Sequence, residues 1–206
     1  MTKQKSEEIL TILKTIITNP KPELDFKNNY ELIVAVILSA QTTDKRVNMV
    51  TKELFDCYPD FFSLSKADKD DVIKIIKPLG MANNKASSII NMAKMVNDDY
   101  NGILPDNLDE LTKLPGVGRK TASVVLALGF NIPAMPVDTH LYRMAKRLGY
   151  IKNDEDVIKA EEAYKKYIPQ EEWILAHHLL LLFGRYHCKA VNPMCDDCKL
   201  KKYCKK

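Results

Sequence analysis

The stretch LPGVGRKTASVVLALG, which runs from Leu114 to Gly129, predicts a tight turn followed by a helix. Small and apolar residues after the turn recur at helical spacing: Ala122, Val125, Leu126 and Gly129. Because the glycine-rich turn ends where this periodicity starts, we expect a helix from about Gly118 to Phe130. A second helix is expected just upstream, over 107–114, so the region is predicted to be helix–turn–helix.

The turn itself has the composition of a connection that binds an anion. Pro115 pre-sets the turn, while Gly116 and Gly118 allow positive φ and remove side chains that would block close approach. The amides from Gly116 through Val117 to Gly118, with the free N–H groups that start the next helix, are suited to hold a phosphate oxygen. A plain connection between two helices is the alternative, since glycine turns of that kind are common.

Lys120 falls in the first turn of the expected helix, where the helix dipole disfavours a cation. One interpretation is a surface cation beside a phosphate site, and the other is a nucleophile. An amine attacks carbon only when it is unprotonated, and the dipole, the neighbouring Arg119 and partial burial would each favour the neutral form. The position that is unfavourable for stability therefore suits a reactive amine.

Asp138, in the sequence VDTH, is expected where the next helix begins. Aspartate is a good N-cap, which is the alternative to a catalytic role. The helix over 118–130 carries the chain away by a little under ~20 Å. Residues 131–137, extended by two prolines, can span somewhat over ~20 Å. The chain can therefore return, and we expect Lys120 and Asp138 to lie at neighbouring helix N-termini that face one cleft.

Helical periodicity extends over nearly the whole chain and predicts an all-α fold. Helices are expected over 6–17 with Ser6 as cap, the apolar segment YELIVAVILSA, 44–58 with Thr43 or Asp44 as cap, 69–77, 83–99, 107–114, 118–130, 138–148, 154–167 and 171–185. No stretch approaches the roughly 20 apolar residues that cross a bilayer, and no signal peptide is apparent. We therefore expect a cytoplasmic protein.

The C-terminal segment combines cysteines with basic residues. Cys188, Cys195, Cys198 and Cys204 have the spacing C-x6-C-x2-C-x5-C, which favours a metal site over disulfides. Thiolate ligands suit zinc or an iron–sulfur cluster, although zinc ribbons usually carry two CxxC pairs and this segment has one. From Arg185 to Lys206 there are seven Lys and Arg residues and two Asp residues, so the net charge of this segment is +5, whereas the net charge of the whole chain is +4. Cys57 stands apart, and we expect it to be buried on an apolar helix face.

A resemblance to a known family is carried by LPGVGRKTA followed by VDTH, and by ILSAQTTD, GMANNKA and HCKAVNPMCDDCKLKKYC elsewhere in the sequence. On these motifs the chain closely resembles the endonuclease III family of helix-hairpin-helix DNA glycosylases. The resemblance covers nearly the whole chain. It implies a two-lobed all-α fold, with a helical bundle domain at 21–134 that contains the helix-hairpin-helix at about 107–130. Residues 1–20 and 135–206 would form the other domain, in which the four cysteines hold one [4Fe–4S] cluster per chain.

The resemblance also implies a bifunctional DNA N-glycosylase and AP lyase, a monomer that acts on double-stranded DNA with damaged pyrimidines or abasic sites and is nucleoid-associated. Lys120 would attack C1′, displace the oxidised base and form a Schiff base that permits β-elimination 3′ to the abasic site. Asp138 would stabilise positive charge on the sugar or assist proton transfers. Two alternatives remain open: a glycosylase of the same fold for another lesion, and a non-catalytic DNA-binding module.

By the same resemblance, Gln41 inserts toward the orphaned partner base and Met81, where relatives often carry leucine, wedges into the duplex. Taken alone, Gln41 would be a surface polar residue and Met81 a core contact. His140 lines the damage pocket or is an ordinary helix residue. Relatives tend to carry glutamate at the position of Thr112 and histidine at that of Phe183, and these departures leave the assigned roles in place.

Overall fold

The structure is a computed structural model that describes residues 1–205, so Lys206, the last residue of the predicted basic segment, lies outside the described residues. Within 1–205 all regular structure is helical, without a strand, which confirms the all-α prediction. The chain forms two compact units, unit 1 from Met1–Lys21 with Pro133–Lys206 and unit 2 from Pro22–Ile132.

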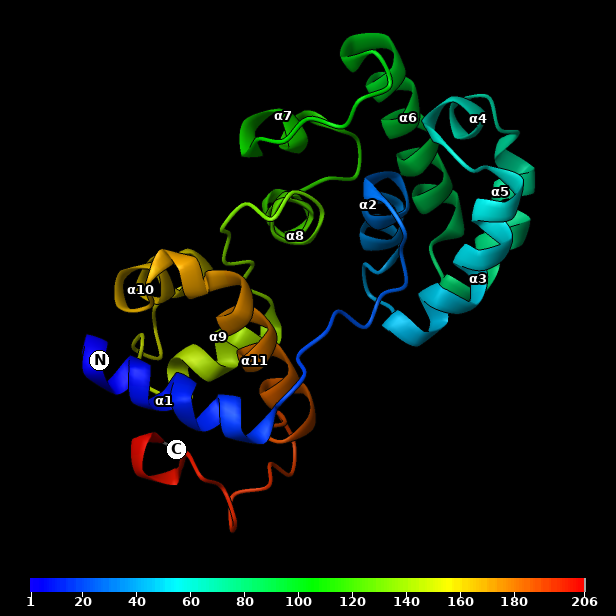
Figure 1. Ribbon diagram of the computed structural model, residues 1–206. Coiled ribbons are helices and arrows are strands. Elements are labelled where there is room, and N and C mark those ends of the chain that lie inside the picture. Colours follow the sequence, from blue (N-terminus) through cyan, green and yellow to red (C-terminus); the bar gives the residue numbers. More distant parts are fainter. Residues whose placement is uncertain (206) are drawn as a thin grey trace. The chain divides into compact units, whose positions relative to one another are not determined.

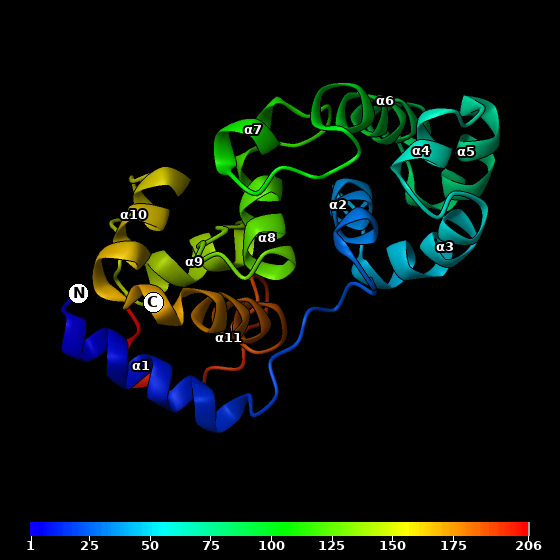
Figure 2. The same ribbon diagram turned by 45° about the horizontal axis from the view of Figure 1, so that its top comes forward.

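Unit 2 is built around the apolar helix α2 (Asn29–Leu38), of which all residues but Asn29 are buried. Such a helix has no polar stripe and must be covered on every side. Helices α3, α6 and α8 cover it (Figures 1 and 2). The helices of unit 2 that follow are α3 (Asp44–Cys57), α4 (Phe61–Ser65), α5 (Lys69–Ile76), η1 (Lys77–Leu79), α6 (Ala82–Tyr100), α7 (Leu108–Lys113) and α8 (Arg119–Gly129).

Two local features of unit 2 differ from the sequence-based predictions. Helix α4 was not predicted, because its five residues are too few to show a period; a capping box between Asp60 and Ser63 starts it. Cys57 is exposed, so the prediction of burial was wrong. It is the last residue of α3 and lies beyond Leu54, the last buried residue of that helix.

Unit 1 contains α1 (Lys3–Ile16), α9 (Thr139–Arg147), α10 (Val157–Tyr167), η2 (Gln170–Glu172), α11 (Trp173–Tyr186) and η3 (Lys201–Tyr203). Helix α9 packs against α10 and α11, and α1 packs against α11 (Figures 1 and 2). Thr2, rather than the predicted Ser6, caps α1. Ser6 is instead fully buried, where its hydroxyl shares a 2.7 Å hydrogen bond with the Tyr150 hydroxyl.

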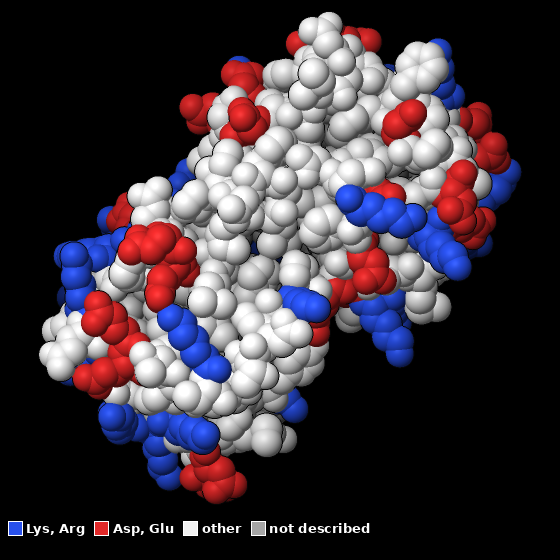
Figure 3. Space-filling view, viewed as in Figure 1, with Lys and Arg blue, Asp and Glu red and all other residues white. Residues whose placement is uncertain are grey.

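Charged side chains of both signs are interspersed on the face drawn in Figure 3. Several Lys and Arg side chains gather low on unit 1, where the C-terminal segment lies, with acidic atoms beside them (Figures 1 and 3). On this face the Lys and Arg side chains therefore form local groups and do not cover the whole face. Among the described helices, none has the length and apolar composition to cross a membrane.

Candidate functional site

The turn between α7 and α8 is held closely against α6. Val117 is 5% exposed, and its amide donates to the Leu114 carbonyl at 3.0 Å. Gly116 has φ of +79°, as its glycine predicted, and an added Cβ would lie 2.8 Å from the Ser88 Cβ of α6. Gly116 is therefore needed both for its backbone conformation and for the close packing of the turn.

Gly118 serves a different purpose from the one predicted. Its φ of −88° is an ordinary extended value, so the expectation of positive φ was wrong at this residue. An added Cβ would meet no atom within 4 Å, and the residue is exposed. Gly118 is the N-cap of α8 but has no side chain to bond the first N–H groups, and the first helical bond is from Ala122 to the Gly118 carbonyl. The uncapped amides of α8 are consequently accessible to an anion.

Lys120 is the second residue of α8 and is exposed, as is Arg119. The predicted partial burial of Lys120 was wrong, because the buried face of α8 starts only at Ala122. No acidic residue lies in the first turn of α8, which belongs wholly to the described part of the chain. The amine thus projects from the positive end of a helix dipole that no carboxylate of that turn offsets.

Asp138 is the N-cap of α9, and its Oδ1 accepts hydrogen bonds from the amides of His140 and Leu141, each at 2.8 Å. The carboxylate is half-buried. Both bonds use Oδ1, so they fix the carboxylate at the positive end of α9 and leave Oδ2 outside the cap. Capping of α9 therefore orients the Asp138 carboxylate and is compatible with a catalytic role of the same side chain.

His140, in the first turn of α9, takes part in a polar network with Arg143. Its Nδ1 lies 3.1 Å from an Arg143 guanidinium nitrogen, which can only donate, so Nδ1 is the acceptor in this contact. Arg143 also donates to the carbonyls of Gly184 at 2.6 Å and Cys188 at 3.0 Å. Burial lowers the pKa of Arg143. The network ties α9 to the end of α11 and to the first cysteine of the C-terminal segment.

Gln41 and Met81 share an unusual backbone conformation. Their φ values are +56° and +49°, in the left-handed region. The other non-glycine residues of the described chain with positive φ are asparagines: Asn101, Asn131 and Asn192. Asparagine tolerates this region, whereas for other L residues it costs roughly 1–2 kcal/mol. Such strain clusters at functional sites. Both side chains are exposed, Met81 at 47%, so the interpretation of Met81 as a core contact was wrong.

Phe183 and Thr112, the two positions at which relatives tend to carry another residue, each make a local contact. Phe183 is buried in α11, where its ring stacks on that of His187 with centroids 4.5 Å apart. Thr112 is exposed on α7, and its hydroxyl donates to the Asp109 carbonyl at 3.0 Å.

The four C-terminal cysteines are all free thiols. Within the described residues, no three His, Cys, Asp or Glu side chains are arranged to hold a metal ion. Backbone hydrogen bonds draw three of them into one compact segment: the Cys198 amide donates to the Cys195 carbonyl at 3.4 Å, and the Lys201 carbonyl accepts from the Cys204 amide at 3.1 Å. Burial raises the pKa of Cys198, and the charges of Cys188, Cys204 and Cys195 add to this effect. Four thiols in one short segment, none of them in a disulfide, are the type and number of donors that a tetrahedral thiolate centre requires.

Arg147 on α9 supports this cysteine segment and was missed by the sequence analysis. Its guanidinium donates to the Cys188 Sγ at 3.2 Å and to the Lys189 carbonyl at 2.8 Å. Its own carbonyl accepts from the Lys205 amide at 2.7 Å. The spacing of Arg143 and Arg147, four residues apart on one helix, was the available signal, since such residues share a helix face.

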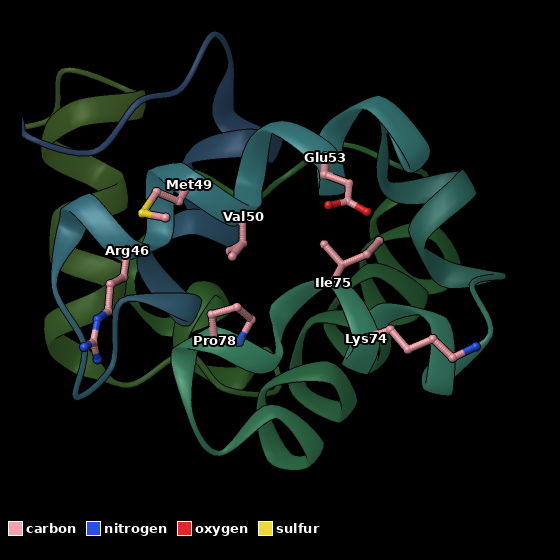
Figure 4. A pocket seen from close by; sticks show the side chains of 7 residues that line it. All are labelled: Arg46, Met49, Val50, Glu53, Lys74, Ile75 and Pro78. Carbon is pink, nitrogen blue, oxygen red and sulfur yellow. The ribbon is translucent and has the colours of Figure 1, made fainter.

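A groove of about 650 Å³ lies in unit 2 between α3 and the α5–η1 segment (Figure 4). Apolar side chains of Val50, Ile75 and Pro78 line it together with charged ones. None of the predicted site residues belongs to its described lining, so this groove has no assigned role.

Comparison with known proteins identifies the family. Residues 34–170 match the model of the HhH-GPD superfamily base excision DNA repair proteins. The chain is 45% identical over 183 residues to endonuclease III of Bacillus subtilis (strain 168), covering 89% of this chain and 84% of that protein. It is 40% identical over 204 residues to endonuclease III of Haemophilus influenzae, covering 99% and 96% of the two chains.

Solved structures agree with these matches. A trapped endonuclease III–DNA covalent intermediate, an estranged-adenine complex, is 43% identical and superposes with a TM-score of 0.96, covering 100% of this chain and 96% of that one. A thermostable thymine-DNA glycosylase, 24% identical with a TM-score of 0.86 over 98% of this chain and 96% of that one, shares the fold. The chain therefore belongs to the endonuclease III family of the HhH-GPD superfamily of base excision DNA repair proteins.

Proposed function

We propose that the protein excises oxidised or otherwise damaged pyrimidines from double-stranded DNA by means of Lys120 and cleaves the strand 3′ to the abasic site. As a member of the endonuclease III family it is a DNA N-glycosylase and AP lyase of base excision repair. Similar structures hold DNA, one of them as a trapped covalent intermediate, which supports a covalent step here.

The helix-hairpin-helix binds the DNA backbone in this proposal. The exposed Gly118 leaves the first-turn amides of α8 open to a phosphate oxygen. Contacts to phosphate position a protein on the duplex and carry no sequence information, as suits an enzyme that must search all sequences.

Gln41 and Met81 fill the space that the damaged nucleotide vacates. A base inside a duplex is out of reach of a nucleophile, so it must leave the stack. The left-handed backbone at both residues supports this role, since it holds two exposed side chains in a conformation that neither residue type favours by itself. An apolar wedge such as Met81 lowers the energy of an opened base step.

The Lys120 amine attacks C1′, and the glycosidic C1′–N bond breaks as the base departs with its electron pair and takes up a proton. The attached Nζ then loses a proton, and its electron pair forms the C1′=N bond of a Schiff base as the C1′–O4′ bond breaks and O4′ takes up a proton. Loss of the C2′ proton then drives the C3′–O bond to break, and the phosphate leaves with that electron pair. Asp138 acts on the same sugar, where its carboxylate stabilises the positive charge that develops at C1′.

The observation that carries this proposal is the exposed Lys120 at the uncapped N-terminus of α8, with no acidic residue in that turn. Borohydride reduction during incubation with abasic DNA tests it, because the reagent converts a Schiff base into a stable adduct. We expect an adduct from the wild type, none from Lys120→Gln, and an undiminished one from Lys94→Gln, which changes an exposed lysine of α6 outside the helix-hairpin-helix. An undiminished adduct in Lys120→Gln would remove Lys120 from the mechanism.

The lesion is tested separately, with duplexes that contain thymine glycol, dihydrouracil, a pyrimidine dimer or a mismatch. Excision of the first two supports the assignment to oxidised pyrimidines, whereas activity confined to dimers or mismatches would favour the rival lesion classes. Because the proposed substrate is double-stranded DNA, we propose that the protein acts on nucleoid DNA in the cytoplasm. We expect a monomer, which light scattering on the enzyme–duplex complex would show as a single chain per duplex.

One [4Fe–4S] cluster per chain would be held by the four C-terminal cysteines, Cys188, Cys195, Cys198 and Cys204. When bound, the cluster supplies metal–thiolate bonds that fold a segment too short for its own hydrophobic core. Arg147 supports the first ligand through its bond to the Cys188 Sγ. Broad visible absorption with about four iron atoms per chain would support the assignment, whereas a colourless protein with stoichiometric zinc would overturn it.

A further inference from the structure

A buried ammonium group in unit 2 has no part in the chemistry proposed above. Lys85, the fourth residue of α6, is 5% exposed. Its Nζ donates to the Leu79 carbonyl at 3.3 Å, just before the turn that leads into α6. Among the described residues no carboxylate pairs with it, and burial lowers the pKa of Lys85. The ammonium therefore has a single acceptor, a backbone carbonyl.

An unpaired buried ammonium is unfavourable for stability, and lysine is almost never found buried without a partner. An apolar side chain of similar length would fill the same space without the desolvation penalty. Because the core gains nothing from the charge, the reason for Lys85 must lie in the backbone that it bonds.

That backbone is the turn Leu79–Gly80–Met81, which contains two successive left-handed residues. Gly80 has φ of +71° and Met81 has φ of +49°. A Cβ added at Gly80 would meet no atom within 4 Å, so glycine is required there for its conformation and not for space. Met81 is the N-cap of α6 and provides no side-chain cap. The turn therefore presents Met81 at the expense of the polar cap that usually fixes a helix start.

Lys85 bonds this turn on both sides. Its side chain holds the carbonyl that precedes Gly80, and its backbone amide donates to the Met81 carbonyl at 3.0 Å. A charged donor in a water-excluded site makes a stronger bond to a carbonyl than a neutral donor does. We propose that Lys85 is a positioning residue, which holds the Leu79–Met81 turn in its strained conformation so that Met81 is preset to enter the opened duplex. The inference rests on the proposed function and adds a residue to it.

The test compares a substrate that needs the wedge with one that does not. In a damaged duplex the base must leave the stack before excision, whereas in single-stranded abasic DNA there is no stack to open. We expect Lys85→Met to lower single-turnover excision from the duplex by tenfold or more, and borohydride trapping on single-stranded abasic DNA by less than twofold. Lys94→Met, which removes an exposed lysine from the same helix, should match the wild type on both.

Combination with Met81→Ala separates positioning from a general effect on folding. If Lys85 acts through Met81, the double variant excises no more slowly than Met81→Ala alone, because the wedge is already absent. Fluorescence of 2-aminopurine opposite the lesion, measured in the Lys120→Gln background, should fall in both single variants as the orphaned base is less exposed. Lys85→Gln keeps a neutral donor and should fall between Lys85→Met and the wild type, and it takes the place of Lys85→Met should that variant not fold.

Equal losses on both substrates, independent losses in the double variant, or an unchanged duplex rate would each overturn the inference. These outcomes differ from a failure of the proposed function, in which the wild type itself forms no adduct with single-stranded abasic DNA.

Discussion

Two glycines of the hairpin turn, separated by Val117, make a matched pair for mutation. Gly116→Ala places a methyl group 2.8 Å from the Ser88 Cβ and 3.3 Å from the Ile37 Cγ2, at φ of +79°. Gly118→Ala places one in open space at φ of −88°. We expect the first substitution to lower stability and the second to lower DNA binding while stability stays nearly constant.

The magnitudes follow from these contacts. Alanine in the left-handed region costs about 1–2 kcal/mol, and insertion of a methyl group against a Cβ, which moves only with its helix, costs about 1–3 kcal/mol. For a chain of this length each kcal/mol lowers Tm by about 2–4 °C, so Gly116→Ala should lose roughly 4–20 °C. At Gly118 the poorer N-cap costs about 1 kcal/mol, and the loss of unfolded-state freedom returns about 0.4–1 kcal/mol.

Thermal unfolding followed by circular dichroism measures the first effect. Binding to a duplex with a stable abasic analogue, at fixed salt concentration, measures the second. We expect Gly118→Ala to keep Tm within about 4 °C of the wild type and to weaken binding about tenfold, which is about 1.4 kcal/mol. Gly116→Ala with an unchanged Tm would refute the packing of the turn on α6, and full binding by Gly118→Ala would refute the assignment of the α8 amides to a phosphate.

Three further substitutions test other parts of the structure. Asp138→Asn keeps an Oδ1 that can cap α9, so we expect Tm to change by less than about 4 °C while excision slows by about 100-fold or more; a normal rate would show that the charge is not used. Burial lowers the pKa of His178, so the unfolded chain takes up a proton near pH 6.5 that the folded chain does not. Stability from neutral His178 is therefore complete above about pH 6.5 and is lost as the pH falls, and the fall in Tm from pH 7.5 to 5 should be smaller in His178→Gln. Cys198→Ser should lose most of the visible absorption and lower the Tm of unit 1, whereas Cys57→Ser, at an exposed position outside the segment, should change neither.

Helix positions were predictable because the apolar residues carry the helical period by themselves. The segment that became α2 was expected to be buried, and the structure buries all but its first residue. Boundaries depended on which polar residue caps each helix. Thr43 was one of two predicted caps and is the cap of α3, whereas Asp156 caps α10 two residues after its expected start at Asp154. Local rules therefore placed the helix starts to within about two residues, and the structure decides which polar residue is the cap.

The site residues divide in the same way. The positions of Lys120 and Asp138 at helix starts were predictable because helix termini have local signals, a glycine turn in one case and an N-cap aspartate in the other. The left-handed conformation at Gln41 and Met81 had no signal, since glutamine and methionine do not favour it. The burial of Lys85 had none either, because the polar stretch ANNKASS is typical of the solvated face of a helix. Both features depend on contacts between elements, which periodicity does not report.

The most direct test of the mechanism is to find the atom that bonds to the sugar. The borohydride-reduced adduct between wild-type enzyme and an abasic oligonucleotide would be digested and sequenced by tandem mass spectrometry. We expect the deoxyribose remnant on Nζ of Lys120 and on no other amine. A remnant on the N-terminal amine, on Lys85 or spread over several surface lysines would contradict the assignment of Lys120 as the nucleophile.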